Sequence, residues 1–137
     1  MSRLKPLVLV AEDDPLVREI IRQRLGVDYR VQTAATGPEA LQALLVQRPQ
    51  VTVLDINLPG LTGFEVLEAL RDQAPGYHAP IIMLSARRSA DDVRRAIALG
   101  AHDYMVKTDS VDHLPRRIER LLRASASGAL ATRPIDL

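Results

Sequence analysis

The sequence contains no cysteine and no tryptophan. Disulfide bonds and thiolate metal sites are therefore excluded. An excess of one charge is also missing, because 18 Lys and Arg residues offset 17 Asp and Glu residues and leave a formal net charge of +1. So little net charge gives weak non-specific attraction to nucleic acids or anionic membranes. We expect no direct binding of nucleic acid and no membrane binding.

Long apolar runs are lacking as well. Segments such as 7–11 and 81–84 fall far short of the roughly 20 residues that a membrane-spanning helix needs. The N-terminal stretch MSRLKPLVLVAEDD reaches acidic residues too early for a secretory signal peptide. What is present, 137 residues of which 47% are apolar, suits one globular domain. We therefore expect a cytoplasmic protein.

Short apolar segments alternate along the chain with longer segments of helical spacing. This alternation predicts an α/β fold, with a doubly wound five-stranded parallel sheet, five helices and flavodoxin-like topology. The second segment alternates polar and apolar residues, which places it at an edge and favours the strand order 2-1-3-4-5. The expected strands are Leu7–Val10, Arg30–Ala34, Val51–Leu54, Ile81–Leu84 and Tyr104–Val106.

The ends of the helices carry local signals. Asp14 followed by Pro15 predicts a helix start, with Asp14 as the cap and with Leu16, Ile20, Ile21 and Leu25 on one inward face. Pro115 lacks an N–H group, so we place it in the first turn of the last helix, with the cap at or near Asp112. Beyond Arg123 the segment ASASGALATRPIDL has no amphipathic period. We divide the chain into a domain of residues 1–124 and a flexible tail or truncated linker of residues 125–137.

Polar residues follow the predicted strands at their carboxyl ends, where a doubly wound sheet binds its ligand. Several carboxylates at one rim repel one another, and a hard cation such as Mg²⁺ relieves this repulsion. A hydroxyl and an ammonium at the same rim suit a phosphoryl group. Only two of the 18 basic residues are lysines, which indicates either a composition bias or a required point charge at the second of them. The residues at the strand ends are Glu12, Asp13, Asp14, Asp55, Ser85 and Lys107.

The segments VLVAEDDP, VLDINLPGLTG, IIMLSA and GAHDYMVK occur in this order over roughly residues 5 to 124. Together they resemble the receiver domain of two-component response regulators. The resemblance implies that Asp55 accepts a phosphoryl group. It also implies that Mg²⁺, or Mn²⁺ in its place, is held by Glu12, Asp13, Asp55 and the backbone carbonyl of Asn57.

The same resemblance assigns roles to three further residues and to the partners. Ser85 corresponds to a hydroxyl switch residue, Lys107 to a phosphoryl-binding lysine and Tyr104 to an aromatic rotamer switch. The donor would be a sensor histidine kinase or a histidine phosphotransfer protein. The signal would be a conformational shift of the face formed by the fourth helix, fifth strand and fifth helix, a face that could also support a homodimer. The protein is then no turnover enzyme, beyond self-phosphorylation from a donor and slow autodephosphorylation.

Two positions depart from the family pattern. Thr108 stands where the family usually has a proline in a cis bond, and a non-proline cis bond costs roughly 2.5 to 4 kcal/mol. We therefore predict a trans Lys107–Thr108 bond and a reshaped loop from Thr108 to Val111. Arg87 stands two residues beyond Ser85, at a variable position that in the family tunes the lifetime of the phosphoryl group. Its side chain could pair with the phosphate or obstruct water, and both interpretations stay open.

Simpler interpretations accompany several of these residues. Asp14 is better explained as a helix cap than as a metal ligand. Tyr104 could be an edge aromatic whose hydroxyl lies in water. The arginines within 87–95 and 116–123 suit a solvated helix face or a docking surface.

Other functions make different demands on the same residues. A phosphatase of the haloacid dehalogenase type needs a second carboxylate two residues after the nucleophile, where this chain has Asn57. A flavin carrier needs a phosphate loop rich in glycine and hydroxyls, but the segment EDDP is acidic. A receiver-like binding module that works without phosphorylation stays open, with Thr108 as its support. The chain would act either as a stand-alone receiver or as the receiver part of a longer protein.

Overall fold

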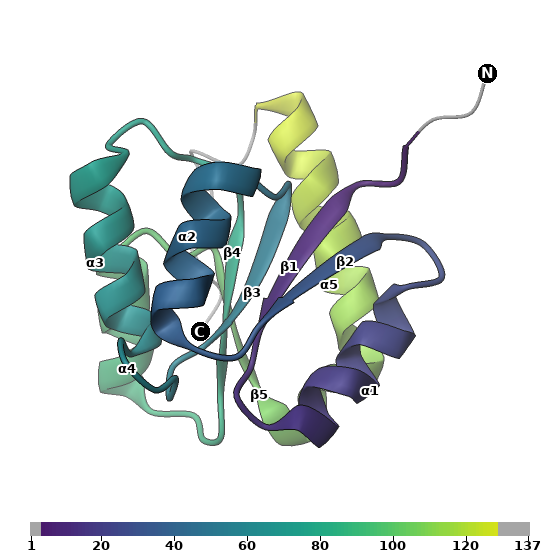
Figure 1. Ribbon diagram of the computed structural model, residues 1–137, viewed down its shortest axis with the longest axis horizontal. Helices are drawn as coiled ribbons and strands as arrows, with labels where there is room; N and C mark the ends of the chain where they lie inside the picture. Colours follow the sequence, from purple (N-terminus) through teal and green to yellow (C-terminus); the bar gives the residue numbers. More distant parts are fainter. Residues whose placement is uncertain (1–3, 129–137) are drawn as a thin grey trace.

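The computed structural model describes residues 4–128, apart from the side chains of residues 109–111. Strands and helices alternate throughout this part of the chain (Figure 1). The strands form one parallel sheet in the order β2-β1-β3-β4-β5, so the predicted doubly wound fold and strand order are confirmed. The elements are β1 (Leu7–Ala11), α1 (Pro15–Leu25), β2 (Arg30–Ala34), α2 (Gly37–Gln47), β3 (Val51–Asp55), α3 (Gly63–Gln73), β4 (Ile81–Ser85), α4 (Ala90–Ala98), β5 (Asp103–Val106) and α5 (Lys107–Ser127).

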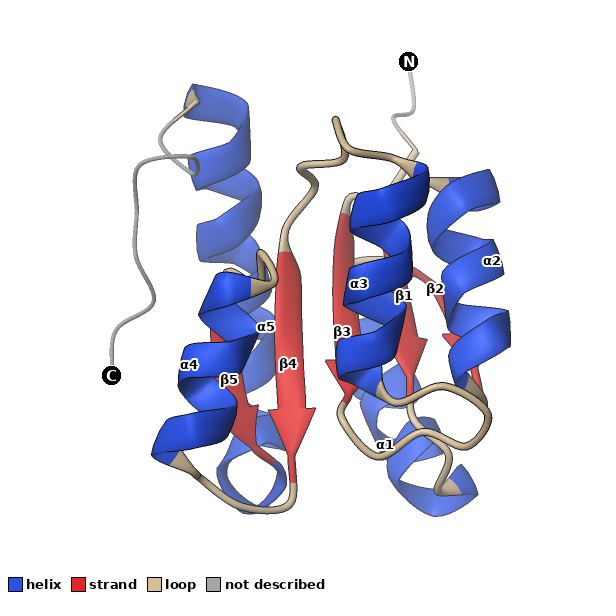
Figure 2. Ribbon diagram, turned by 90° about the vertical axis from the view of Figure 1, so that its left-hand side faces the viewer, coloured by secondary structure: helices blue, strands red, loops and turns tan. Residues whose placement is uncertain are grey.

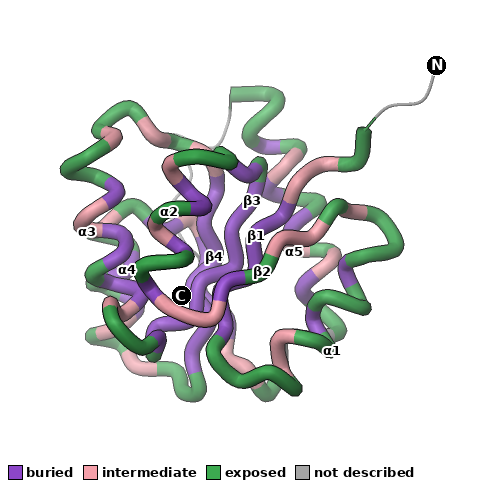
Figure 3. Tube along the Cα trace, viewed as in Figure 1, coloured by how far each residue is buried: buried purple, intermediate pink, exposed green. Residues whose placement is uncertain are grey.

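Helices cover both faces of the sheet. Helices α1 and α5 lie on one face, and α2, α3 and α4 lie on the other (Figures 1 and 2). Successive side chains of a strand point to opposite faces. Accordingly, β1 contributes Val8 and Val10 to the core under α1 and α5, and Leu9 and Ala11 to the core under the other three helices. Strands β3 and β4 are buried along their whole length (Figure 3), and all strands end at the same rim (Figure 2).

Helix α1 begins as predicted but is rotated from the predicted inward face. Asp14 Oδ1 accepts hydrogen bonds from the backbone N–H groups of Leu16 at 2.9 Å and Val17 at 3.3 Å, which confirms Asp14 as the cap. The buried residues of α1 are Ile21 and Leu25, whereas Leu16 and Ile20 are 68% and 43% exposed. Val17 packs against the same core cluster as Ile21 and Leu25. Val17, Ile21 and Leu25 are spaced four residues apart and so form one stripe on the helix. Leu16 and Ile20 each precede a residue of this stripe by one position and therefore lie beside it.

The start of α5 also differs from the prediction. The helix begins at Lys107 directly after β5, so the predicted loop from Thr108 to Val111 and the predicted cap at Asp112 are both wrong. Pro115 lies inside the helix, where it removes one backbone hydrogen bond. The trans Lys107–Thr108 bond is confirmed, since residues 4–128 contain no cis peptide bond. A trans bond lets the chain pass straight from strand to helix, and burial of Leu114 and Ile118 offsets the loss at Pro115.

The end of α5 lies beyond the predicted limit of helical periodicity. The helix continues past Arg123 to Ser127, Ala124 is buried, and Gly128 closes the helix with φ of 78°. Positive φ at this position is the usual reason for a glycine after a helix. Residues 129–137 of the predicted tail lie outside the described residues. Among the described residues, no helix combines the length and apolar character required to cross a bilayer.

Candidate functional site

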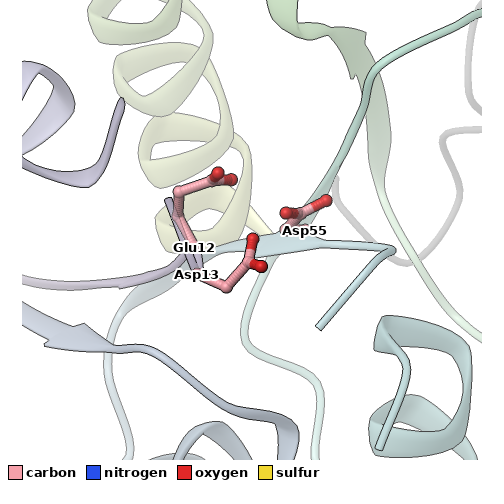
Figure 4. A group of neighbouring side chains, drawn as sticks. All are labelled: Glu12, Asp13 and Asp55. Carbon is pink, nitrogen blue, oxygen red and sulfur yellow. The ribbon is translucent and has the colours of Figure 1, made fainter. Parts of the chain in front are cut away.

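The ends of β1 and β3 bring three carboxylates together. Glu12 and Asp13 follow β1, and Asp55 is the last residue of β3. The register that pairs Ala11 with Leu54 places the next residues of both strands side by side. Carboxylate oxygens of the three residues lie within 4.8 Å of one another, and their side chains converge in Figure 4. Glu12 and Asp55 are buried and Asp13 is exposed, so the cluster opens to solvent on one side.

Lys107 reaches this cluster from the end of β5. Its Nζ atom donates hydrogen bonds to Glu12 Oε1 at 3.0 Å and to Asp55 Oδ2 at 2.9 Å. Burial disfavours the charged ammonium, but the bonds to Asp55 and Glu12 outweigh this effect and raise the pKa of Lys107 above its ordinary value. The lysine is therefore a fixed positive charge beside two buried carboxylates.

The carboxyl group of Glu12 is held in an unusual environment. Burial, together with the neighbouring carboxyl group of Asp55, raises the pKa of Glu12 from 4.5 to about 7, and Lys107 opposes this shift. Its Oε2 atom is buried and has no hydrogen-bond partner. An unpartnered buried oxygen beside two further carboxylates is a donor set that suits a hard divalent cation. The three acidic residues thus fit a metal of the Mg²⁺ class.

Ser85 and Tyr104 are linked through the backbone of Arg87. Ser85 Oγ accepts a hydrogen bond from the Arg87 N–H group at 3.2 Å, and the Tyr104 hydroxyl donates to the Arg87 carbonyl at 3.0 Å. Tyr104 is only 2% exposed, so the interpretation as an edge aromatic with its hydroxyl in water is wrong. The Arg87 residue itself is exposed. One peptide segment after β4 therefore contacts both predicted switch residues.

The loop after β3 shapes the other side of Asp55. The backbone N–H group of Asn57 donates to Asp55 Oδ1 at 3.1 Å, and Asn57 is exposed. Gly63, at the start of α3, lies against this strand end, because a Cβ atom there would stand 2.5 Å from the Asp55 carbonyl oxygen. Gly63 is not among the site residues predicted from the sequence. A glycine at the first position of a helix, where it lends no helical stability, was the available signal.

Arg18 is a second residue at the site that is not among those predicted from the sequence. Its guanidinium group donates hydrogen bonds to the backbone carbonyls of Glu12 and Asp13. The sequence places this arginine one turn into α1, close after the acidic pair, but a helical arginine is most often only a solvated charge. No local pattern distinguishes it from the other arginines of the chain.

Several arginines on α4 and α5 form ion pairs within the chain. Arg117 donates to the buried carboxylate of Asp103 at 2.6 Å, and Arg95 contacts Glu68 at 3.3 Å and the Phe64 ring at 4.5 Å. Further pairs join Arg94 to Asp91 and Arg123 to Glu119. Most of these side chains are substantially exposed, as expected for a solvated face.

Comparisons with known proteins agree on one family. The model of the response regulator receiver domain matches residues 8–119. The chain is 40% identical over 128 residues to the transcriptional regulatory protein PrrA of Mycobacterium tuberculosis, with 93% of this chain and 54% of the relative covered. It is 37% identical over 130 residues to the transcriptional regulatory protein KdpE of the same organism, with 94% and 56% covered. The chain thus spans about half the length of these relatives.

Solved structures of receiver domains have the same fold. The Francisella response regulator 1452 receiver domain has a TM-score of 0.81 and 31% sequence identity, covering 88% of this chain and 99% of that one. The chemotaxis response regulator CheY4 of Vibrio cholerae has a TM-score of 0.78 and 32% identity, covering 85% and 98%. The fold, the acidic rim and these relatives together show that the chain belongs to the family of response regulator receiver domains of two-component systems.

Proposed function

We propose that this receiver domain accepts one phosphoryl group on the Asp55 carboxylate from a histidine kinase or a histidine phosphotransfer protein. The observation that carries the proposal is the position of Lys107 Nζ, 2.9 Å from Asp55 Oδ2 and 3.0 Å from Glu12 Oε1. An ammonium at this point can stabilise the negative oxygens of a phosphoryl group as they arrive. Ser85, at the end of the neighbouring strand, supplies a hydroxyl at the same rim.

The transfer itself needs little covalent chemistry from the protein. An Asp55 carboxylate oxygen attacks the phosphorus of a phosphohistidine in line with the P–N bond. The new O–P bond forms as the P–N bond breaks, and the imidazole nitrogen leaves with the electron pair and takes up a proton. The Asn57 N–H group, 3.1 Å from Asp55 Oδ1, holds the carboxylate in one orientation during this step.

A divalent cation is part of the proposal. Glu12, Asp13 and Asp55 would hold Mg²⁺, or Mn²⁺, with the Asn57 carbonyl as a further ligand. Bound Mg²⁺ supplies positive charge that offsets the repulsion between the carboxylates and the phosphoryl oxygens. The converging carboxylates and the unpartnered Oε2 atom of Glu12 support this proposed cation site. Lys107 is bonded to both buried acids, Glu12 and Asp55.

The conformational signal follows from the contacts of Arg87. Phosphorylation adds charge and acceptor oxygens at Asp55, which would draw the Ser85 hydroxyl away from the Arg87 N–H group. The same backbone segment binds the Tyr104 hydroxyl, so its movement changes how Tyr104 and α4 pack. The result is a population shift in the face of α4, β5 and α5. This face is also the surface through which we propose that a homodimer forms. We assign Arg87 a tuning role in the phosphoryl lifetime.

The output of the whole protein is a further proposal. PrrA and KdpE are named transcriptional regulatory proteins, and this chain corresponds to about half of each. We propose that residues 1–124 are the receiver and that its output partner is either a DNA-binding domain in the same full-length protein or a separate protein that docks on the α4, β5 and α5 face. The receiver itself makes no direct contact with nucleic acid in this proposal.

The decisive experiment measures phosphorylation of the intact chain. The protein is incubated with Mg²⁺ and acetyl phosphate, and its intact mass is recorded beside a control receiver domain. We expect one added phosphoryl group, lost in Asp55→Asn and lost when a chelator removes Mg²⁺. Asp14→Asn is the matched control, because asparagine also caps helices and Asp14 lies next to the acidic pair; it should be labelled like the wild type.

An unmodified mass, under conditions that label the control receiver, would contradict the proposal. It would support the alternative of a receiver-like module that binds partners without phosphorylation. Lys107 keeps its bonds to Asp55 and Glu12 although Thr108 follows it, which argues against this alternative. Repeated turnover of a small phosphate ester would instead indicate a phosphatase.

A further inference from the structure

We infer that Arg18 is a positioning residue for the metal site, acting on the backbone that carries Glu12 and Asp13. The inference rests on the proposed function, since it concerns the cation that these two residues and Asp55 would hold. Arg18 Nη1 donates to the Glu12 carbonyl at 2.9 Å and to the Asp13 carbonyl at 3.4 Å. It is half-buried on α1, the helix that follows the acidic pair.

The positions of the Glu12 and Asp13 side chains require the backbone to depart from strand geometry, and Arg18 stabilises this departure. Adjacent residues of an extended strand point to opposite faces of the sheet. Yet Glu12 and Asp13 are adjacent, and both place a carboxylate oxygen within 4.8 Å of the others in the cluster. The backbone must therefore leave the strand geometry at this pair, and a donor that binds both carbonyls fixes that departure.

Other contacts fix the ends of this turn, and the Asp14 N–H group donates to Glu12 Oε1 at 3.4 Å across it. The N–H group of Glu12 continues the sheet by donating to Ala34 at 3.0 Å. Asp14 then caps α1 through its side chain. Between these two points stand the carbonyls of Glu12 and Asp13, and Arg18 binds both. The planar guanidinium group suits this task, because it presents several donors in a fixed geometry.

Arg18 and Lys107 bind different atoms of the acidic residues. Lys107 binds carboxylate oxygens of Glu12 and Asp55 directly. The two hydrogen bonds from Arg18 end on main-chain carbonyls instead. Arg18 thus holds the backbone of the acidic pair without using a carboxylate oxygen of either residue.

Groups of this kind, which orient metal ligands without touching the metal, typically change metal affinity by about 10- to 100-fold when they are removed. We therefore expect Arg18→Met to weaken Mg²⁺ binding by about 10-fold or more. Methionine keeps much of the apolar stem and removes both hydrogen bonds. Arg18→Lys keeps the charge but loses the planar fork, so its affinity should fall between those of Arg18→Met and the wild type.

The test is a calorimetric titration of Mg²⁺ into the wild type, Arg18→Met, Arg18→Lys and Arg22→Met. Arg22 is the matched control, because it lies on the same helix and binds Glu19 on the exposed surface. Its substitution should leave the dissociation constant unchanged. Urea unfolding in the presence of a chelator, for every variant, shows that the fold is intact before the affinities are compared.

A second readout separates positioning from a general loss of activity. The Mg²⁺ concentration for half-maximal phosphorylation should rise in Arg18→Met, while the rate at saturating Mg²⁺ returns to that of the wild type. Equal Mg²⁺ affinity in a folded Arg18→Met and the wild type would overturn the role of Arg18 alone. Wild-type affinity in Arg18→Lys, with weak binding in Arg18→Met, would also overturn it, because charge and not geometry would then be responsible. A wild type that binds no Mg²⁺ would overturn the metal site and this inference together.

Discussion

Lys107 Nζ lies 2.9 Å from Asp55 Oδ2, although the two residues are 52 positions apart in the chain. Asp55 is the last residue of β3, and Lys107 is the first residue of α5. Because α5 starts directly after β5, the lysine is held by a strand and a helix at once. The positive charge opposite Asp55 is therefore part of the fold.

Substitution of Lys107 by methionine should affect both stability and phosphorylation. The variant leaves Glu12 and Asp55 buried together without a cation, which should lower the free energy of unfolding by about 1 to 3 kcal/mol in the absence of Mg²⁺. Phosphorylation by acetyl phosphate should slow by about 100-fold. Urea unfolding with a chelator and mass spectrometry over time measure the two effects.

Lys5→Met is the natural control for this variant, since Lys5 is the other lysine of the chain. Lys5 Nζ donates to the Val27 carbonyl in an exposed position. The Lys5→Met substitution should change neither the free energy of unfolding nor the rate of phosphorylation. Wild-type phosphorylation in Lys107→Met would show that the ammonium does not assist the transfer.

Tyr104→Phe removes one hydrogen bond and leaves the ring packing in place. The lost bond is the one from the Tyr104 hydroxyl to the Arg87 carbonyl. We expect the free energy of unfolding to fall by about 0.5 to 1.5 kcal/mol, with phosphorylation retained. Chemical denaturation compares this variant with Tyr29→Phe, which should stay within about 0.5 kcal/mol of the wild type. Equal stabilities would mean that the Arg87 contact contributes nothing.

The fold and the acidic site could be predicted from the sequence because each depends on local signals. Short apolar strands fix the sheet, and parallel strands bring their carboxyl ends to one rim. Asp55, Glu12 and Asp13 could be assigned to one place by that rule before any distance was known. Asp14 was predictable as a cap because the following proline marks a helix start.

Other features depend on contacts that a single sequence does not display. The rotation of α1 is set by packing of Ile21 and Leu25 against the sheet, and apolar spacing alone also admitted Leu16 and Ile20. The start of α5 was misplaced because Pro115 favours a first turn, whereas burial of the residues around it dominates. The link from Ser85 to Tyr104 passes through the main chain of Arg87, which residue identity does not encode.

The ion pair between Asp103 and Arg117 should contribute more to stability than those on the surface. Asp103 is 4% exposed and is bound by Arg117 at 2.6 Å, with Arg120 farther away at 3.7 Å. Arg117→Met should therefore cost about 1.5 to 3 kcal/mol, because a buried carboxylate loses its closest cation. Arg123→Met, which breaks an exposed pair with Glu119, should cost less than about 1 kcal/mol.

A double-mutant cycle on Asp103 and Arg117 tests why the Arg117→Met variant loses stability. In Arg117→Met combined with Asp103→Asn, no unpaired carboxylate remains, so the double variant should be more stable than the sum of the single effects indicates. Denaturation of the four proteins in one buffer measures the coupling. Strict additivity would show that the two side chains do not interact in solution.

His102 should make stability depend on pH. Its Nδ1 atom accepts a hydrogen bond from the Ile81 N–H group at 3.2 Å, which requires that nitrogen to be unprotonated. Burial lowers the pKa of His102 below its ordinary value of 6.5. His102 lines a cavity of about 230 Å³ between α3 and α4, and Arg71 also lines this cavity. The unfolded chain therefore takes up a proton at higher pH than the folded protein. The contribution of His102 is fully present above pH 6.5 and is lost as pH falls from 6.5 through the lower pKa of the folded state.

His102→Asn tests this directly, because the asparagine side-chain oxygen can accept the bond from Ile81 without titrating. At pH 7.5 the variant and the wild type should differ little in their free energies of unfolding, and at pH 5.5 the wild type should have lost stability relative to the variant. Urea unfolding at both pH values measures this difference, and His78→Asn, at an exposed position of the loop before β4, is the control for replacement of a histidine elsewhere. A constant difference between wild type and His102→Asn at the two pH values would mean that protonation of His102 is not coupled to folding.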